Sequence, residues 1–263
     1  MTALPGLEGL TAFRIEAGDG IATVFIDRPP VNAQNGGFRD EVIRVFDVLH
    51  DTPEVRAIVL TGAGKTFSAG ADLKDRPDAA RPGAFPRHSR AVRAGFDCVM
   101  ECSKPVIAAV NGAAIGAGCV LALVCDIILV AEDAFMSMTE VDVGLAGGVK
   151  HVLRHFGQSD ARMFLMTARR LYGPDLLRMN VASGCYPKEA LLPAAQAMAR
   201  EIAGKVPLAV EAAKRAFTLN EYMPLHEGYR YEQTQTALLA KTEDTKEALA
   251  AFAEKRRPVF KGR

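Results

Sequence analysis

The sequence predicts an α/β fold in which strands and helices alternate over roughly the first 150 residues and helices fill the remainder. Short apolar runs rich in β-branched residues occur at 21–27, 56–61 and 105–110, a pattern typical of buried strands. Glycine-rich turns follow the last two of these runs. Beyond residue 150 the apolar residues follow helical spacing, and no strand pattern is convincing. Strands and helices spaced this closely predict a mostly parallel or spiral-like sheet.

The expected elements follow one another with recognisable stop signals. Arg28-Pro29-Pro30 ends the first strand, and Asp51-Thr52-Pro53 ends the helix that follows it. The segment 75–86, rich in Pro, Arg, Ala and Asp, predicts a mobile surface loop. Further strands are expected at 125–130 and 135–138. Helices are expected at 37–50, 89–102, 119–124, 159–168, 174–180, 188–204, 206–219, 224–241 and 243–256. The C-terminal helices are rich in alanine, which suits packing either on the same core or on other subunits.

Composition excludes several classes of function. The 263 residues carry 32 basic and 31 acidic side chains, so the net charge of +1 predicts no nucleic-acid partner and no membrane partner. Five cysteines without a C-x-x-C pair predict free thiols in a reducing compartment and no disulfide framework. The N-terminal stretch MTALPGLEGLTAFRIEAGDG does not resemble a signal peptide. We therefore expect a cytoplasmic protein.

One apolar run, 112–131, is long enough for a membrane span and carries a single charge, Asp126. No partner for Asp126 is evident in the sequence, and a break after Val124 divides the run. The prediction is a short buried helix followed by a buried strand.

The stretch GAGKTFSAGADLK, residues 62–74, superficially matches two catalytic motifs. A phosphate-binding P-loop requires a glycine at position 59, where Val59 lies inside a strand. A hydrolase elbow requires Gly-x-Ser-x-Gly, but Thr66 occupies the first glycine position before Ser68. Neither motif is supported, so Ser68 is not expected to be a nucleophile.

Two further motifs also fail. Gly112, Gly116 and Gly118 lack the G-x-G-x-x-G spacing of dinucleotide-binding folds. His151 and His155 in HVLRH share one helical face, but no glutamate follows the first histidine as zinc proteases require. Two exposed helical histidines are the expected outcome, and no metal or separate cofactor is predicted.

The two glycine-rich turns, SAGAD and IGAG, remain. Backbone N–H groups at such turns can bind a developing negative charge, and small side chains let a substrate approach the backbone. Small residues that merely allow tight packing account for the turns equally well.

The two regions carrying these turns resemble a known family. TFSAGADLK and KPVIAAVNGAAIGAGCVLALVCDIILVAEDAFMSMTEVDVGL look like the signature regions of the crotonase (enoyl-CoA hydratase/isomerase) superfamily, and the resemblance extends from Ile21 to the C-terminus. It implies a crotonase-like spiral of ββα units, with a core over residues 1–200 and a C-terminal helical trimerisation region over 201–263. It also implies an acyl-CoA substrate and a homotrimer or homohexamer.

The same resemblance implies site residues. The backbone N–H groups of Ala71 and Ala117 would form an oxyanion hole for the thioester enolate, although Ala117 stands where glycine is common. Substrate and CoA contacts would come from Ala69, Gly70, Asp72, Lys74 and Gly116.

The acid/base residues depart from the two-glutamate pattern of hydratases. Glu140 matches the second glutamate, whereas Val120 stands at the first. The dienoyl-CoA isomerase subgroup carries two further aspartates, whose positions here are Val120 and Gly148. Asp142 is expected to face away from the pocket and to have a structural hydrogen-bonding role.

These observations predict an enoyl-CoA hydratase or isomerase with Glu140 as its single acid/base. A catalytically weak acyl-CoA binding protein, or a thioester hydrolase or decarboxylase of the same fold, is the alternative. By analogy the loop 75–93 covers the acyl pocket, where His88, Arg90 or Arg93 could meet a polar acyl tail, although surface positions for these three residues account for the sequence equally well.

Overall fold

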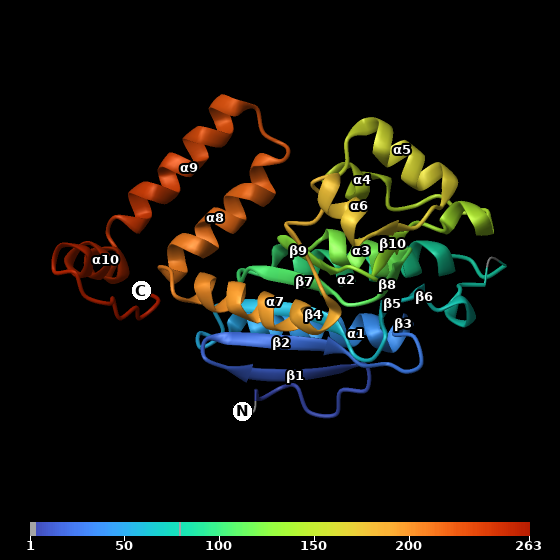
Figure 1. Ribbon diagram of the computed structural model, residues 1–263, viewed down its shortest axis with the longest axis horizontal. Coiled ribbons are helices and arrows are strands. Elements are labelled where there is room, and N and C mark those ends of the chain that lie inside the picture. The colour runs from blue at the N-terminus through green and yellow to red at the C-terminus, as the bar shows by residue number, and fades with distance from the viewer. Residues whose placement is uncertain (1–3, 79) are drawn as a thin grey trace.

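The computed structural model describes residues 4–78 and 80–263, and its architecture is built on a six-stranded sheet (Figure 1). The sheet has the order β1-β2-β4-β7-β9-β12. β1 pairs antiparallel with β2, and all the other pairs in this sheet are parallel. Its strands are β1 (Phe13–Gly18), β2 (Ile21–Ile26), β4 (Ala57–Gly62), β7 (Val106–Val110), β9 (Ile127–Ala131) and β12 (Gly184–Tyr186).

Two smaller sheets lie at one edge of this core, and they carry the glycine-rich turns. The four-stranded sheet has the order β11-β10-β8-β5, and the two-stranded sheet joins β3 to β6. Their strands are β3 (Ala33–Gln34), β5 (Thr66–Ser68), β6 (Gly70–Ala71), β8 (Ala113–Ile115), β10 (Phe135–Ser137) and β11 (Leu171–Tyr172). Each turn of the chain thus supplies a long strand, one or two short strands and then a helix, which confirms the predicted spiral of ββα units.

The helices cover the sheets and extend beyond them. They are α1 (Gly36–Asp51), α2 (Ala84–Glu101), α3 (Ala117–Leu123), α4 (Val149–Leu153), α5 (Gln158–Thr167), α6 (Gly173–Arg178), α7 (Lys188–Ala203), α8 (Pro207–Asn220), α9 (Leu225–Leu239) and α10 (Glu243–Ala253), with short 3₁₀ turns η1 (Leu73–Asp75) and η2 (Glu140–Val143). No helix in the described part of the chain is long and apolar enough to span a membrane. The apolar run 112–131 forms β8, α3 and β9, so the expected short helix and buried strand are confirmed.

The helix α1 illustrates how the sequence produces these elements. Asn35 caps it by accepting a hydrogen bond from the Phe38 N–H at 2.9 Å. Its buried residues recur at helical spacing, so one face of the helix packs against the core. These buried residues are Phe38, Val42, Val45, Phe46 and Leu49.

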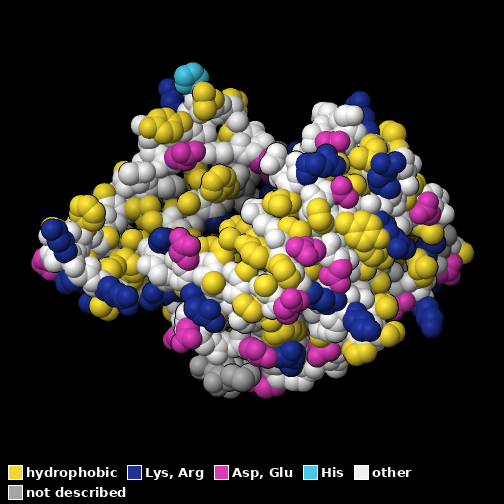
Figure 2. Space-filling view, in the orientation of Figure 1, with side chains coloured by type: hydrophobic (Ala, Val, Ile, Leu, Met, Phe, Trp, Pro, Cys, Tyr) yellow, Lys and Arg dark blue, Asp and Glu magenta, His cyan; other side chains and the backbone are white. Residues whose placement is uncertain are grey.

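The C-terminal helices leave the core after α7, which packs on the large sheet. In Figure 1, α8 and α9 form a hairpin that projects from the sheet, and α10 follows α9 at the left of the view, at the end of the hairpin opposite its turn. The expected boundary at residue 200 falls in the last turn of α7. Figure 2 shows apolar side chains gathered over these C-terminal helices. The exposed apolar residues of this region include Phe217 on α8 (81% exposed), Leu225 on α9 (84%) and Phe252 on α10 (87%).

An ion pair between a buried lysine and a more exposed aspartate ties α8 to the core. The Lys214 Nζ lies 2.8 Å from Asp126 Oδ2 and donates to the Lys104 carbonyl at 2.9 Å. Asp126 also accepts the Val106 N–H at 2.7 Å. The inference that Asp126 has no partner is therefore wrong, because its partner lies 88 positions later (214 − 126) on a helix that only the tertiary fold brings close.

Several expectations about the elements need correction. The prediction of no strand after residue 150 is wrong, since β11 and β12 add edge strands to two sheets. The helix α2 begins at Ala84, five residues before the expected start, so much of the segment 75–93 is helical and not a loop. Ala79 of that segment, like residues 1–3 of the N-terminal stretch, lies outside the described residues. Two-residue strands and the short β12 carry too few residues for a periodic pattern to be detected.

Candidate active site

The two glycine-rich turns meet at the edge of the small sheets. β5, before the first turn, pairs in parallel with β8, before the second. Gly70 has φ +83°, and a Cβ placed on it would lie 2.4 Å from the Ile115 carbonyl oxygen and 3.2 Å from the Ala117 nitrogen. Only glycine fits this contact, because a side chain would collide with backbone atoms. The sequence feature of two small-residue turns thus becomes one composite site.

Buried side-chain polar groups hold the first turn against the second. The Ser68 hydroxyl donates to the Asn32 carbonyl at 2.7 Å. Gln34 Nε2 donates to Ser68 Oγ at 3.2 Å and to the Ala117 carbonyl at 3.3 Å. Ser68 is fully buried and already has hydrogen-bond partners, which agrees with the expectation that it is no nucleophile.

The backbone amides of Ala71 and Ala117 border a common cavity of about 130 Å³. The Asp72 N–H donates to the Gln34 carbonyl at 2.9 Å, and neighbouring amides of a strand point in opposite directions, so the Ala71 N–H points away from β3. Ala117 is the first residue of α3, and its N–H has no acceptor within that helix. Both amides are therefore placed to serve a ligand in the cavity.

Glu140 lies beside the second turn, at the start of η2 after β10. A Cβ placed on Gly116 would stand 2.9 Å from Glu140 Oε1. The other carboxyl oxygen, Oε2, is buried and has no hydrogen-bond partner among the described residues. Burial raises the pKa of the Glu140 carboxyl above its usual value. A carboxyl group with a raised pKa and a free oxygen is suited to accept and return a proton.

The two positions that match the aspartates of the dienoyl-CoA isomerase subgroup, 120 and 148, carry no acid in this chain. Val120 is buried, and its Cγ2 lies 3.2 Å from the Cβ position of Gly148, so the two positions that match the subgroup's aspartates are neighbours. Asp142 is exposed, and no side-chain hydrogen bond of Asp142 occurs among the described residues. The structural hydrogen-bonding role expected for it therefore has no support.

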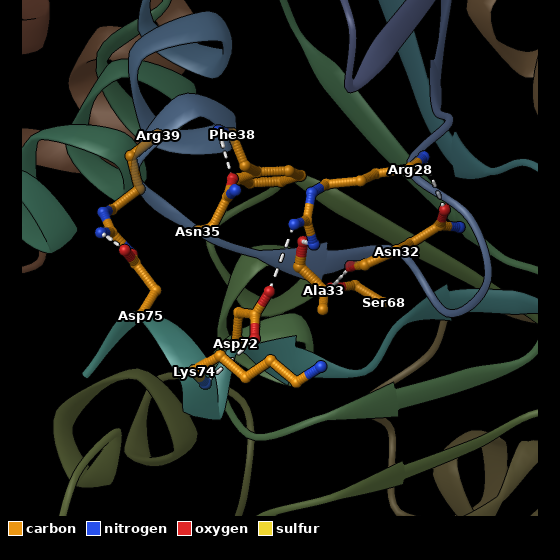
Figure 3. A network of polar contacts seen from close by, with 10 residues as sticks. All are labelled: Arg28, Asn32, Ala33, Asn35, Phe38, Arg39, Ser68, Asp72, Lys74 and Asp75. Atoms are coloured by element: carbon orange, nitrogen blue, oxygen red, sulfur yellow. Dashed lines mark hydrogen bonds and ion pairs between the residues drawn. The ribbon is translucent and has the colours of Figure 1, made fainter.

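Asp72 and Lys74, two other expected site residues, lie in a polar network around the first turn (Figure 3). Asp72 caps η1 by accepting the Lys74 N–H at 3.1 Å, and its carboxylate also pairs with Arg28 Nη2 at 3.2 Å. The Lys74 side chain is exposed, and Ala69 is half-buried. Asp72 therefore stabilises the loop that leaves the first turn, while Lys74 is free to meet an anion.

The histidine pair considered as a metal site is not arranged as one. His151 lies in α4 and makes an edge contact with Phe96, with ring centroids 5.7 Å apart. His155 follows the end of that helix, and its Nε2 lies 2.8 Å from the Leu123 carbonyl oxygen. Both rings are half-buried, so the expectation of two exposed histidines on one helical face is wrong. Across residues 4–78 and 80–263, no three His, Cys, Asp or Glu side chains are grouped to hold a metal ion.

The sequence missed residues that only the fold brings to the cavity. Its lining includes Gln34 from β3, Arg39 from α1 and His88 from α2. Of these three residues, only His88 was an expected contact of the acyl group. Arg90 and Arg93 are exposed and do not line it. Position 39 carries no motif, so no local signal could have found it.

Comparison with known proteins decides the family. A family model described as Enoyl-CoA hydratase/isomerase matches residues 16–263. The chain belongs to the enoyl-CoA hydratase/isomerase (crotonase) family. A carnitinyl-CoA dehydratase of Citrobacter koseri is 36% identical over 257 residues, covering 92% of this chain and 95% of that protein.

Solved structures of the crotonase family share the same architecture. An enoyl-CoA hydratase from Bacillus anthracis superposes with a TM-score of 0.90 at 30% identity, covering 96% of this chain and 100% of the other. An enoyl-CoA hydratase from Mycobacterium smegmatis has a TM-score of 0.89 at 26% identity, with 95% and 98% covered. The protein is thus a crotonase-family acyl-CoA enzyme with the fold of enoyl-CoA hydratases.

Proposed function

We propose that the protein catalyses proton transfer next to the thioester carbonyl of an enoyl-CoA, with Glu140 as its only carboxyl acid/base. The amides of Ala71 and Ala117 bind the thioester oxygen. The observation that carries this proposal is the buried Glu140 carboxyl, with its unpartnered Oε2, beside the turn that supplies the Ala117 amide.

The oxyanion hole lowers the barrier to forming an enolate. When the α-carbon loses a proton, negative charge develops on the thioester oxygen, and fixed N–H donors stabilise that charge without reorganising. Each such donor contributes about 3–4 kcal/mol in enzymes where one has been removed. Gly70 and Gly116 allow this close approach because neither has a side chain over the turns.

One carboxyl group can complete either of two reactions. In isomerisation, Glu140 removes a proton from C2 of a 3-enoyl thioester and returns it to C4, while the double bond moves to C2–C3. In hydration, water adds its oxygen to C3 and transfers one proton to the Glu140 carboxylate. Glu140 then transfers that proton to C2. In both reactions Glu140 alone accepts and returns the proton, so no second acid is needed.

Val120 affects the two reactions differently. It replaces a carboxylate that would help hold a water molecule, and a valine side chain neither binds water nor carries a proton. Isomerisation needs no bound water, so the apolar side chain of Val120 favours isomerisation over hydration. The dehydratase and hydratase relatives support the hydration reaction or its reverse.

The test is to measure hydration of crotonyl-CoA and isomerisation of a 3-enoyl-CoA with wild type and Glu140→Gln. We expect the substitution to lower kcat by about 10²–10⁴-fold for whichever reaction the wild type catalyses, since that is the usual contribution of a general acid/base. Asp142→Asn is the matched control, because Asp142 is an exposed acid two positions away, and its activity should equal that of wild type.

Undiminished activity in Glu140→Gln contradicts the role proposed for this residue. Retained acyl-CoA binding without turnover by the wild type indicates the binding-protein alternative. Release of free CoA or CO₂ from the same substrates indicates a thioester hydrolase or decarboxylase.

A further inference from the structure

The cavity bordered by Ala71 and Ala117 has one cationic side chain in its wall. Its volume of about 130 Å³ is small beside the roughly 300–1,000 Å³ of pockets for drug-sized ligands, so it suits a short acyl group. Most of the lining is apolar, from Phe38, Val42, Val92, Phe96 and Leu121. Arg39, on the first turn of α1, is the exception.

The Arg39 side chain is unusually buried for a charged group. Its side chain is only 12% exposed, and its Nε is buried with no hydrogen-bond partner among the described residues. An unpartnered buried donor is costly, and a charged one more so. In native structures such groups are usually satisfied by a ligand, a water molecule or an ion.

Part of the guanidinium is already engaged, and its burial is asymmetric. Arg39 Nη2 lies 2.7 Å from Asp75 Oδ2, and the Asp75 side chain is 39% exposed (Figure 3). Water therefore screens the anionic partner more than it screens the cation. The stem of Arg39 is held by close helix packing, since a Cβ on Gly95 of α2 would stand 3.9 Å from Arg39 Cγ.

The other polar side chains of the cavity do not provide a competing cation. Burial and the nearby Arg39 lower the pKa of His88, which leaves that ring neutral near pH 7. The Gln34 amide already donates to Ser68 and to the Ala117 carbonyl. Arg39 is thus the charged donor that remains available to a ligand.

We propose that Arg39 is a specificity-determining residue that selects short acyl groups with a carboxylate at the end remote from the thioester. With the thioester oxygen at Ala71 and Ala117, the acyl chain runs through the apolar cavity and its carboxylate pairs with the Arg39 guanidinium, which lines that cavity. This inference rests on the proposed function only for the placement of the thioester.

The test compares two unreactive ligands of similar chain length, butyryl-CoA and glutaryl-CoA, by titration calorimetry. Wild type should bind glutaryl-CoA about 10- to 100-fold more tightly, as a charge-assisted hydrogen bond to a buried guanidinium implies. In Arg39→Met the ratio of the two dissociation constants should fall to near one. Arg93→Met is the matched control, an exposed arginine on α2 outside the cavity lining, and it should keep the wild-type ratio.

A wild type without preference for glutaryl-CoA, or an Arg39→Met protein that keeps the preference, overturns the inference. Should Arg39→Met fail to fold, Asp75→Asn decides. This variant removes the carboxylate that competes for the guanidinium, so the preference for glutaryl-CoA should increase, and an unchanged ratio overturns the inference. Because both ligands lack the reactive double bond, this outcome is independent of turnover, so a failure of the Glu140 assignment remains distinguishable from a failure of this one.

Discussion

The carboxyl group of Glu140 occupies the space next to Gly116 where a side chain would otherwise lie. A Cβ on Gly116 would stand 2.9 Å from Oε1 and 3.6 Å from Cδ of Glu140. Gly116 also has φ 52° and ψ −119°, a backbone conformation that L-residues with a side chain rarely adopt. The absence of a side chain at this position therefore determines both the shape of the second turn and the position of the Glu140 carboxyl group.

Gly116→Ala should lower both stability and activity. The backbone strain costs on the order of 1–3 kcal/mol, and the new methyl group displaces the Glu140 carboxyl. Gly64→Ala is a matched control, because Gly64 has φ +74° but a Cβ there meets nothing within 4 Å. Chemical denaturation and kcat measure the two effects. Equal loss of activity in both variants would refute the specific role of Gly116.

Glu140→Gln should stabilise the protein at neutral pH while lowering kcat. Burial raises the folded-state pKa of Glu140 above 4.5, so ionisation opposes folding. This penalty is absent below the unfolded-state pKa, grows as pH rises through the window between the two pKa values, and is complete above the folded-state pKa. Thermal unfolding from pH 4 to 8 should show a widening gap between variant and wild type, whereas Asp142→Asn should show none. A gap that narrows with rising pH contradicts the assignment.

The pH dependence of activity should follow the same carboxyl group. As a base Glu140 must be ionised, so kcat/KM should rise with pH through its raised pKa and show a single ionisation on that limb. Val120→Glu should add a second ionisation, because two neighbouring carboxyl groups titrate as a coupled pair. Val120→Gln, similar in size but not ionisable, should keep the single limb. A profile of Val120→Glu identical to that of wild type would place the two positions too far apart to interact.

Lys214→Met should destabilise the protein by about 1–3 kcal/mol. The Lys214 side chain is 5% exposed, and its removal takes a donor from the Lys104 carbonyl and the cation from Asp126, whose side chain is 28% exposed. Lys205→Met provides the control, since Lys205 forms an exposed pair with Glu201 at 3.6 Å, and such pairs contribute about 0–1 kcal/mol. Urea unfolding would distinguish them, and a similar effect of both substitutions would mean that Lys214 does not hold α8.

The helices after residue 201 are proposed to form the trimer interface. Leu225 and Phe252 are 84% and 87% exposed, and exposed apolar side chains of this kind mark interaction surfaces. Leu225→Glu combined with Phe252→Glu should lower the mass measured by light scattering towards that of a monomer. Met166→Glu, at a 72% exposed position on α5, should leave the mass unchanged. An unaltered mass in the double variant would locate the interface elsewhere.

Much of the fold was predictable from local sequence. Strand β2 and helices α1, α7 and α8 follow patterns of apolar residues that one window of sequence contains, because burial of one face imposes a period on the chain. The turns around Gly70 and Gly116 were also identified from the sequence, and Glu140 as the candidate acid/base was implied by the resemblance to the crotonase family. The start of α2 at Ala84 was missed, since Pro and Arg residues near it resemble those of a surface loop.

Other features depend on contacts between residues far apart in the sequence. Asp126 is stabilised by Lys214, and the edge strand β12 is defined by its pairing with β9. Arg39 reaches the cavity because α1 packs against α2 at Gly95. The sequence by itself determined the local elements and the two turns, because their periodicity and glycine conformations act over a few residues. Only the tertiary structure decided which side chains face the acyl cavity, because that depends on how distant elements pack.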